Sequence, residues 1–202
     1  KLENECDPIE YSNLDADGHI VSPIFHEISD DVFKKIKSDS NFLFVDPQGF
    51  LRQKDSNGNV ILKKTDLDLS DVNAIKINPE EGQNIVSGSH DEMMLALQKK
   101  GIEYVLLTNK VDVSLLVKNR VYSLKLPNKT VHDTTGIGDI FCSAFTCTML
   151  KEKDFLWALC FAAGSAQAAL ESNNVGLQKI PKKGMVENNA SYFYNLVDFR
   201  DL

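Results

Sequence analysis

DTTGIGD, from Asp133 to Asp139, runs without a break into an apolar segment that begins Ile140-Phe-Cys-Ser-Ala-Phe145. The apolar run predicts a helix, and two glycines at its start allow successive backbone N–H groups to turn toward one point. The positive end of the helix dipole adds to the attraction for an anion there. The stretch therefore predicts an anion-binding turn.

Asp139 is the candidate general base of this stretch. A carboxylate in the first helical turn, beside a bound phosphoryl group, lies where the proton of an alcohol must be accepted. The residues alone leave a second interpretation open, in which Gly136 and Gly138 make only a tight turn and Asp139 only caps a helix. Short motifs often match by chance, so context has to decide.

Strand and helix patterns alternate through the rest of the chain. Apolar spacing predicts strands at residues 41–46, 74–78 and 104–108 and helices at residues 29–38, 90–100, 140–150, 155–170 and 185–196. Two antiparallel pairs are also predicted, residues 50–54 with 60–62 around Asn57-Gly58, and residues 113–117 with 121–126. The fold class expected is α/β, a mostly parallel sheet flanked by helices with an antiparallel hairpin portion.

Composition argues against two classes of partner. The 202 residues carry a formal net charge of -7, which leaves no broad basic surface for nucleic acid or anionic lipid. The most apolar segment, residues 155–170, is interrupted by Gly164, Ser165 and Gln167 and is too short for a membrane span. We expect a small-molecule partner, with neither nucleic acid nor membrane.

The cysteines indicate a reducing compartment. Cys6, Cys142, Cys147 and Cys160 form no CxxC pair, and the last three lie in apolar stretches where a thiol usually acts as a small buried hydrophobe. The four histidines have no zinc-ligand spacing. A cytoplasmic protein without a transition-metal site is therefore expected.

The full string from Asp133 to Asp139 closely resembles the signature of the ribokinase family, the PfkB-type carbohydrate kinases. That signature reads Asp-Thr-x-Gly-Ala-Gly-Asp, and Ile137 in place of alanine is the only departure within it. The resemblance implies a ribokinase-like fold and ATP as the phosphoryl donor. It also implies that Asp139 is the catalytic base and that the amides of Gly136, Ile137 and Gly138 hold the transferred group.

The resemblance extends to metal ions. Asn78-Pro-Glu-Glu81 resembles the family's Asn-x-x-Glu motif, which implies Mg²⁺ near the phosphates. Mg²⁺ prefers oxygen ligands and keeps several waters, so an amide and a carboxylate acting largely through water suit it. Read alone, the string is an ordinary helix start, and both interpretations can hold together. Asp133 and Thr135 align with the family's monovalent-cation loop, which implies a cation such as K⁺ behind the anion-binding turn.

Nucleotide contacts are implied by two further segments. Residues 161–170 resemble the small-residue helix that flanks adenine in this family, although small side chains equally let two helices pack closely. The family's Thr-x-Gly-x-x-Gly is replaced by Thr108-Asn-Lys-Val-Asp-Val113, so Lys110 is either a point charge for a phosphate or a solvated loop lysine. The candidate nucleotide-binding residues are Thr108, Lys110, Thr134, Gly136, Gly138, Ala163, Gln167 and Gly176.

Substrate contacts are implied more weakly. Ser22-Pro23, residues 26–29 and residues 45–52 look like segments of a branch of the family that acts on sugars and cyclitols. This implies that Gln48 and Arg52 lie near the substrate, together with Asp139. Turn chemistry gives another account, in which residues 47–49 form a surface turn and Arg52 is solvated.

No segment resembles the front of the family fold, which carries the lid and most sugar-binding residues. Lys1 is not a methionine, and the polar residues 1–19 do not resemble the beginning of a fold. We therefore expect a single, incomplete ribokinase-like α/β domain over residues 1–202, the carboxy-terminal portion of a longer protein. Lids often form the dimer contact in this family, which leaves a homodimer through the absent lid open.

Three functions fit these observations. The first is an ATP-dependent phosphotransferase that moves the γ-phosphoryl group to a hydroxyl of a sugar, cyclitol or nucleoside. The alternative is a non-catalytic nucleotide-binding or regulatory module of the same fold, which the altered loop after Thr108 favours. The third is an α/β domain whose glycine turn binds no ligand. Retention of Asp139 together with Asn78 and Glu81 favours the kinase.

Overall fold

The structure is a computed structural model that describes residues 2–127, 133–172 and 174–202. The chain divides into two compact units. The amino-terminal unit comprises residues 1–108 and 116–119, and the carboxy-terminal unit comprises residues 109–115 and 120–202. The expectation of a single domain stays a prediction.

The strands confirm the α/β fold class. A mixed, mostly parallel sheet has the strand order β1-β2-β5-β6-β7-β8-β9, and β3 and β4 form a separate two-stranded sheet. The parallel strands of the amino-terminal unit are β1 (His19–Val21), β2 (Leu43–Val45), β5 (Ala74–Ile77) and β6 (Tyr104–Asn109). Every residue of β2 and β5 is buried, as expected for strands covered on both faces.

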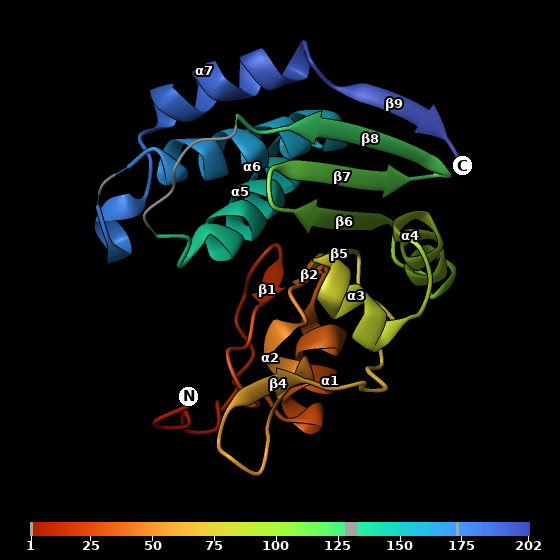
Figure 1. The fold of residues 1–202 in the computed structure, drawn as a ribbon, viewed down its shortest axis with the longest axis vertical. Helices are drawn as coiled ribbons and strands as arrows, with labels where there is room; N and C mark the ends of the chain where they lie inside the picture. Colours follow the sequence, from red (N-terminus) through yellow and green to blue (C-terminus); the bar gives the residue numbers. More distant parts are fainter. Residues whose placement is uncertain (1, 128–132, 173) are drawn as a thin grey trace. The chain divides into compact units, whose positions relative to one another are not determined.

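Four helices belong to the amino-terminal unit, α1 (Asp30–Asp39), α2 (Gln48–Leu51), α3 (Pro79–Ile85) and α4 (His90–Lys99) (Figure 1). The Ser29 hydroxyl accepts a hydrogen bond from the Val32 amide at 3.3 Å, which caps α1 as its sequence predicts. Phe33 and Ile36 bury the apolar face of the same helix. Helices α1 and α4 both lie within one or two residues of their predicted bounds.

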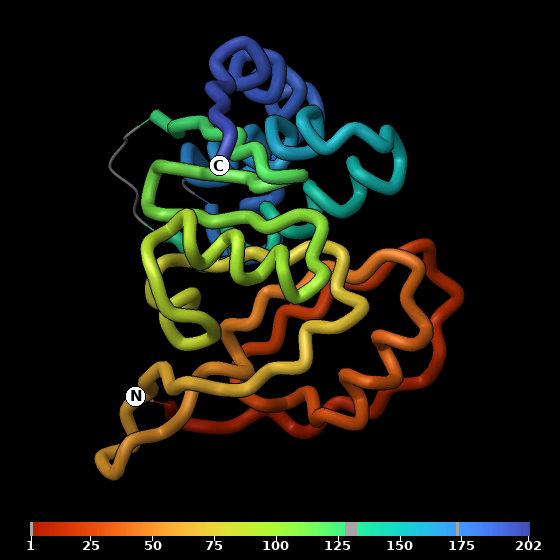
Figure 2. The backbone as a smooth tube through the Cα atoms, turned by 90° about the vertical axis from the view of Figure 1, so that its right-hand side faces the viewer, coloured from red at the N-terminus to blue at the C-terminus, as the bar shows by residue number. Residues whose placement is uncertain are grey.

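The hairpin predicted from residues 50–54 and 60–62 is confirmed in part. Strands β3 (Arg52–Lys54) and β4 (Val60–Leu62) pair antiparallel, and the hairpin projects from its unit (Figure 2). The preceding residues form the single-turn helix α2, where the sequence predicts a turn and the beginning of a strand. A side chain at Gly49 would place its Cβ 2.3 Å from the carbonyl oxygen of Pro23, so the backbone approaches that loop closely. This packing holds α2 in place.

The carboxy-terminal part of the chain contributes the remaining elements. These are β7 (Asp112–Val117), β8 (Arg120–Lys125), α5 (Ile137–Glu152), α6 (Phe155–Leu170), the 3₁₀ helix η1 (Gly176–Lys179), α7 (Lys183–Tyr194) and β9 (Asp198–Asp201). The predicted helices at residues 140–150, 155–170 and 185–196 are therefore confirmed, with α5 beginning three residues earlier. The turn between β7 and β8 has positive φ angles at Lys118 and Asn119, which fits a tight hairpin.

Helix α6 packs between α5 and α7 (Figure 1). A Cβ at Gly164 would lie 2.9 Å from both the Ala190 amide nitrogen and the Val186 carbonyl oxygen, so α6 and α7 approach each other at backbone distance. The small residues of α6 thus serve helix packing at this point. No helix among the described residues has the length and apolarity that a membrane crossing requires.

The first and last strands have no counterpart in the sequence prediction. β1 is three residues long and only Val21 is buried, and all four residues of β9 are exposed. Neither has an alternating or continuous apolar pattern. β9 depends instead on pairing with β8, where Arg120 lies opposite Asp201 and the two side chains form an ion pair at 2.6 Å.

Candidate active site

The predicted anion-binding turn lies in the carboxy-terminal unit, at the amino end of α5. Gly136 is the N-cap residue, and its φ of 78° is the left-handed conformation that favours glycine. A Cβ there would meet no atom within 4 Å, so conformation rather than crowding requires glycine. The Thr135 amide donates to Asp133 Oδ1 at 2.9 Å, which closes the turn.

Asp139 and the neighbouring amides occupy the predicted helix start. Asp139 lies in the first turn of α5 and is exposed. Ile137, predicted to hold the transferred group, donates its amide to the Thr134 carbonyl oxygen at 3.2 Å. Gly138 is the second residue of α5, so its amide lies in the first helical turn, where no carbonyl of the helix can pair with it.

A buried cation, which the sequence did not predict, lies behind this turn. Lys179, the last residue of η1, is 3% exposed. Its Nζ donates to the Asp133 carbonyl oxygen and to Asp133 Oδ2, both at 2.9 Å, and to the Thr135 carbonyl oxygen at 3.1 Å. This ammonium holds the pKa of the Asp133 carboxyl well below its usual range. Asp133 and Thr135, the predicted monovalent-cation ligands, therefore already hold a positive charge.

A cavity of about 800 Å³ opens beside the turn, within the same unit. Its polar lining includes Asp133, Asp139 and Lys179, and its apolar lining includes Ile140, Val175 and Leu177. Gly136 and Gly176, two of the predicted nucleotide contacts, also line it. Cys147 lines it with an exposed thiol, which corrects the expectation that this cysteine is buried. The cavity thus joins the helix start that is predicted to bind an anion to apolar surface, the combination that a nucleotide needs.

Ala163 and Gln167, the other predicted adenine contacts, are buried in α6. Gln167 donates through Nε2 to Glu171 at 2.7 Å. Neither residue is among those that line the cavity. Their nucleotide role stays a prediction, and the close α6–α7 packing accounts for glycine at position 164.

The predicted magnesium residues lie in the amino-terminal unit, at the carboxyl end of β5. Asn78 caps α3. Its side-chain oxygen accepts from the backbone amide of Glu81, and Glu81 Oε2 accepts from the backbone amide of Asn78, both at 2.9 Å. This reciprocal capping box confirms the helix-start interpretation. Glu81 is 1% exposed, and burial raises the pKa of its carboxyl, although the nearby Lys76 ammonium acts to lower it.

A buried ion pair adjoins Glu81. Lys76 of β5 and Asp46, which follows β2, are 2.6 Å apart, with side chains 11% and 6% exposed. The charges of Lys76 and Asp46 both act on the Glu81 carboxyl. The described residues therefore concentrate two carboxylates and one ammonium at the carboxyl ends of two parallel strands. This is where ligands bind in open α/β sheets. Glu81 and Asn78 supply the hard oxygen donors that suit Mg²⁺.

Gln48 and Arg52, the predicted substrate residues, flank α2 in the amino-terminal unit. The backbone amide of Gln48 donates to Asp46 Oδ1 at 3.3 Å, which brings this residue beside the buried ion pair. Arg52 is half-buried and donates through Nη1 to the Ile24 carbonyl oxygen at 3.1 Å. Their contact with a substrate stays a prediction.

The loop after β6 lacks the glycines of the family loop and turns at Lys110. Lys110 has a φ of 55°, so a non-glycine residue adopts the left-handed conformation in the turn to β7. Thr108 donates through its hydroxyl to the Ile77 carbonyl oxygen at 3.5 Å. The nucleotide roles of both residues stay predictions.

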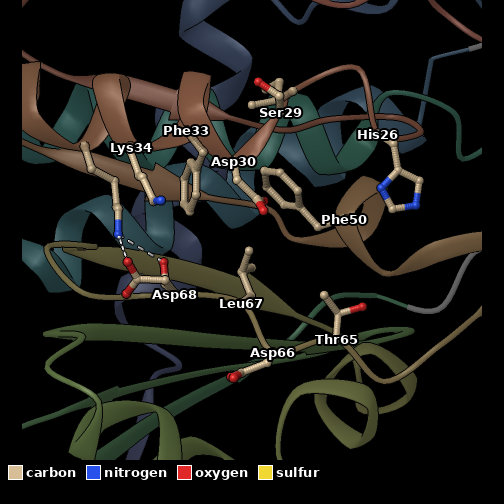
Figure 3. A pocket seen from close by; sticks show the side chains of 12 residues that line it. His26, Ser29, Asp30, Phe33, Lys34, Phe50, Thr65, Asp66, Leu67 and Asp68 are labelled. Carbon is tan, nitrogen blue, oxygen red and sulfur yellow. Dashed lines mark hydrogen bonds and ion pairs between the residues drawn. The ribbon is translucent and has the colours of Figure 1, made fainter.

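A second cavity, of about 420 Å³, lies in the amino-terminal unit (Figure 3). The side chains of Phe33 and Phe50 line it, and the Lys37–Asp68 ion pair closes one part of it at 2.5 Å. None of the site residues predicted from the sequence lines this cavity. Among the residues that the structure describes, no cluster of three or more His, Cys, Asp or Glu side chains is placed to hold a metal ion.

Several solved structures have the same fold. A structure describing the conversion of a pyrophosphate-dependent myo-inositol-1 kinase into a myo-inositol-3 kinase matches with a TM-score of 0.78 and 20% identity, over 96% of this chain and 70% of that chain. A pyrophosphate-dependent kinase of the ribokinase family, complexed with a pyrophosphate analog and myo-inositol, gives 0.76 and 20% identity, over 92% and 68%. Ribokinase from Arabidopsis thaliana, complexed with ribose and ATP, gives 0.63 and 20% identity, over 85% and 55%.

These likenesses confirm the ribokinase-like fold. The chain spans a little over half the length of the Arabidopsis ribokinase and about two thirds of the chains in the other two structures. Among curated proteins, no sequence matches the chain significantly. The sequence model of the pfkB family of carbohydrate kinases matches residues 33–183, most of the chain. With this match, and with the signature turn and the parallel sheet in place, this chain belongs to the pfkB family of carbohydrate kinases.

Proposed function

We propose that the protein containing this chain is an ATP-dependent phosphotransferase that moves the γ-phosphoryl group to a hydroxyl of a sugar or cyclitol. The observation that carries the proposal is the exposed carboxylate of Asp139 in the first turn of α5, lining the same cavity as Gly136. A proton acceptor and an anion-binding helix start thus share one cavity. Membership in a carbohydrate kinase family supports this choice of reaction.

The chemistry follows from this arrangement. The carboxylate of Asp139 accepts the proton of the substrate hydroxyl as that oxygen forms a bond to the γ-phosphorus. The bond between the γ-phosphorus and the β–γ bridging oxygen breaks, and the leaving group departs as ADP. The amino end of α5, with the amides of Gly136 and Gly138, offsets negative charge on the transferred group.

Asn78 and Glu81 are the residues proposed to hold Mg²⁺. Their oxygen donors suit a hard, hydrated cation, and burial raises the pKa of the Glu81 carboxyl, an effect that a bound cation would oppose. Bound Mg²⁺ supplies charge neutralisation on the phosphates. Because both side chains already form the capping box, contact largely through water fits them best.

The non-catalytic alternative rests on the loop after Thr108, which has no glycine. That loop nevertheless makes the tight β6–β7 turn, with Lys110 in the left-handed conformation. The missing glycines therefore do not remove the turn, and this loop alone gives little reason to prefer a binding module. A kinase remains the better-supported proposal.

The test is a donor and acceptor screen of the full-length protein. ATP and, separately, pyrophosphate are offered with ribose, myo-inositol and nucleosides, because three similar structures are described as pyrophosphate-dependent. We expect ATP consumption that depends on one acceptor class. Turnover with pyrophosphate but not with ATP would show that the donor is pyrophosphate. Turnover with neither donor would contradict the kinase proposal.

Asp139→Asn tests the role of the base in the same protein. The substitution keeps the shape of the side chain and removes the proton acceptor, so kcat should fall by roughly 10²–10⁴-fold. Nucleotide affinity, measured by calorimetry, should stay within about threefold because uniform binding is not removed. Asp154→Asn, at the N-cap of α6 outside the cavity, is the matched control. Unchanged kcat in Asp139→Asn would refute the assignment.

A further inference from the structure

Lys179 is an unusual feature of the cavity because its charge is buried. Its side chain is 3% exposed, while its partner Asp133 is 36% exposed. An ammonium has three N–H donors, and three oxygens receive them, two from Asp133 and one from Thr135. Burial of a charge is costly unless it is paired and hydrogen-bonded, and here both conditions hold. The site is therefore built for a cation.

The contacts fix the direction of the peptide groups in the anion-binding turn. In a trans peptide the C=O and N–H bonds point in opposite directions. The Thr135 carbonyl faces the Lys179 ammonium, so the Gly136 N–H, which belongs to the same peptide, points away from it. Asp133 braces the turn a second time, because its Oδ1 accepts from the Thr135 amide at 2.9 Å.

We propose that Lys179 is a positioning residue, a built-in cation that holds the Asp133 and Thr135 carbonyls so that the Gly136 amide faces the phosphoryl donor. The proposal rests on the proposed function. It assigns to the chain's own lysine the place at which the sequence resemblance implies a monovalent cation. The protein should therefore work without K⁺.

Removal of the side chain gives the proposal a specific consequence. Lys179→Ala leaves a space lined by two carbonyl oxygens and one carboxylate oxygen. Oxygen ligands of this kind suit a monovalent cation, so K⁺ or NH₄⁺ should enter and restore the turn. Lys179→Met fills the space with an apolar chain and should not be restored. If the Lys179 side chain only filled space, neither the restoration of Lys179→Ala by cations nor its contrast with Lys179→Met would be seen.

The first readout does not depend on activity. Thermal unfolding of the full-length protein is measured in KCl, NH₄Cl and choline chloride at equal ionic strength. We expect the midpoint of the native protein to be the same in all three salts. The midpoint of Lys179→Ala should be lower in choline and rise saturably with K⁺ or NH₄⁺, because binding to the folded state stabilises it. Lys179→Met should be low in every salt.

The second readout uses the kinase assay. In choline chloride, Lys179→Ala should lose roughly a hundredfold in kcat/KM, the cost expected for misplacing a reacting group by about an ångström. The KM for the donor should carry much of the loss and should recover in K⁺. Lys183→Ala, which removes an exposed lysine four residues along the chain, is the matched control and should behave as the native protein.

The two readouts separate the proposal from the proposed function. A K⁺-dependent midpoint in Lys179→Ala supports the built-in cation even if no acceptor is phosphorylated. A native protein whose midpoint or donor KM depends on K⁺ would overturn it, and so would a Lys179→Ala variant that is insensitive to cations. If Lys179→Ala does not fold, the native protein in the three salts still decides.

Discussion

Lys76 and Asp46 show how strongly two residues can affect stability in the amino-terminal unit. Their ion pair is almost fully buried, and Glu81 lies within its electrostatic reach. An isolated ion pair in a protein interior contributes little net stability, but half of one is strongly destabilising. The cluster therefore makes the ends of β2 and β5 sensitive to any change of charge.

Lys76→Met should lower the free energy of unfolding by about 3–5 kcal/mol, because it leaves the Asp46 carboxylate buried without its partner. Urea unfolding measures the loss. The double variant Lys76→Met with Asp46→Asn removes both charges and keeps an acceptor for the Gln48 amide, so it should recover a large part of the stability. Lys54→Met, which breaks an exposed ion pair with Glu5, is the control and should cost at most about 1 kcal/mol. Equal losses from Lys76→Met and Lys54→Met would contradict the buried-pair interpretation.

At the scale of elements, helix α5 lines the cavity, α6 packs against α5, and α7 packs against α6. The contact between α6 and α7 is set by Gly164, at which the two backbones approach each other. Overpacking forces side chains or backbone to shift, and here the neighbours are backbone atoms of α7 that cannot rotate away.

Gly164→Ala should therefore destabilise the protein by about 1–3 kcal/mol, in spite of the higher helix propensity of alanine. Gly184→Ala is the matched control, because a Cβ there meets no atom within 4 Å on helix α7. The control should be neutral or slightly stabilising. Urea unfolding midpoints decide between them, and a stable Gly164→Ala would show that α7 moves without cost.

The elements also show what the sequence could predict. Long apolar segments such as α6 and short buried strands such as β5 were predicted because their own residues carry the pattern. β1 and β9 were missed because each is short and mostly exposed, and pairing with a distant strand defines them. α2 was predicted as a turn because four residues cannot show helical periodicity.

The site residues likewise divide into those that local motifs predict and one that only the fold brings into place. The turn at Gly136 and the capping box of Asn78 and Glu81 follow from local motifs, and the structure forms both. Lys179 was missed because its oxygen partners lie 44 and 46 residues away, and nothing in its neighbourhood in sequence marks it. Only the fold brings the ammonium to the turn.

At the scale of the whole molecule, the described carboxylates favour neutral over acidic conditions. Hydrogen bonds from Lys37 and Lys179 hold the pKa values of Asp68 and Asp133 below their ordinary value of 3.8. Such groups contribute stability above their unfolded pKa and lose it as pH falls through the folded pKa. Glu81, whose pKa is raised by burial, acts in the opposite sense.

The free energy of unfolding should therefore be nearly constant around neutrality and fall as the pH drops below about 4. Chemical unfolding at a series of pH values measures this slope. Asp133→Asn should be less stable at neutral pH and show a shallower acid slope, because the titrating partner of Lys179 is gone. Asp17→Asn, on an exposed carboxylate, is the control and should keep the native slope. An acid slope that is unchanged in Asp133→Asn would contradict the role given to this pair.

The close approach at Gly49 has a consequence for how this sequence can vary. The second residue of α2 touches the Pro23 loop with its bare α-carbon, and even a methyl group would collide with main-chain atoms. Codon randomisation at this position should return glycine alone among folded clones. Position 49, which the sequence alone marks only as part of a turn, is thus one at which almost no substitution is compatible with the fold.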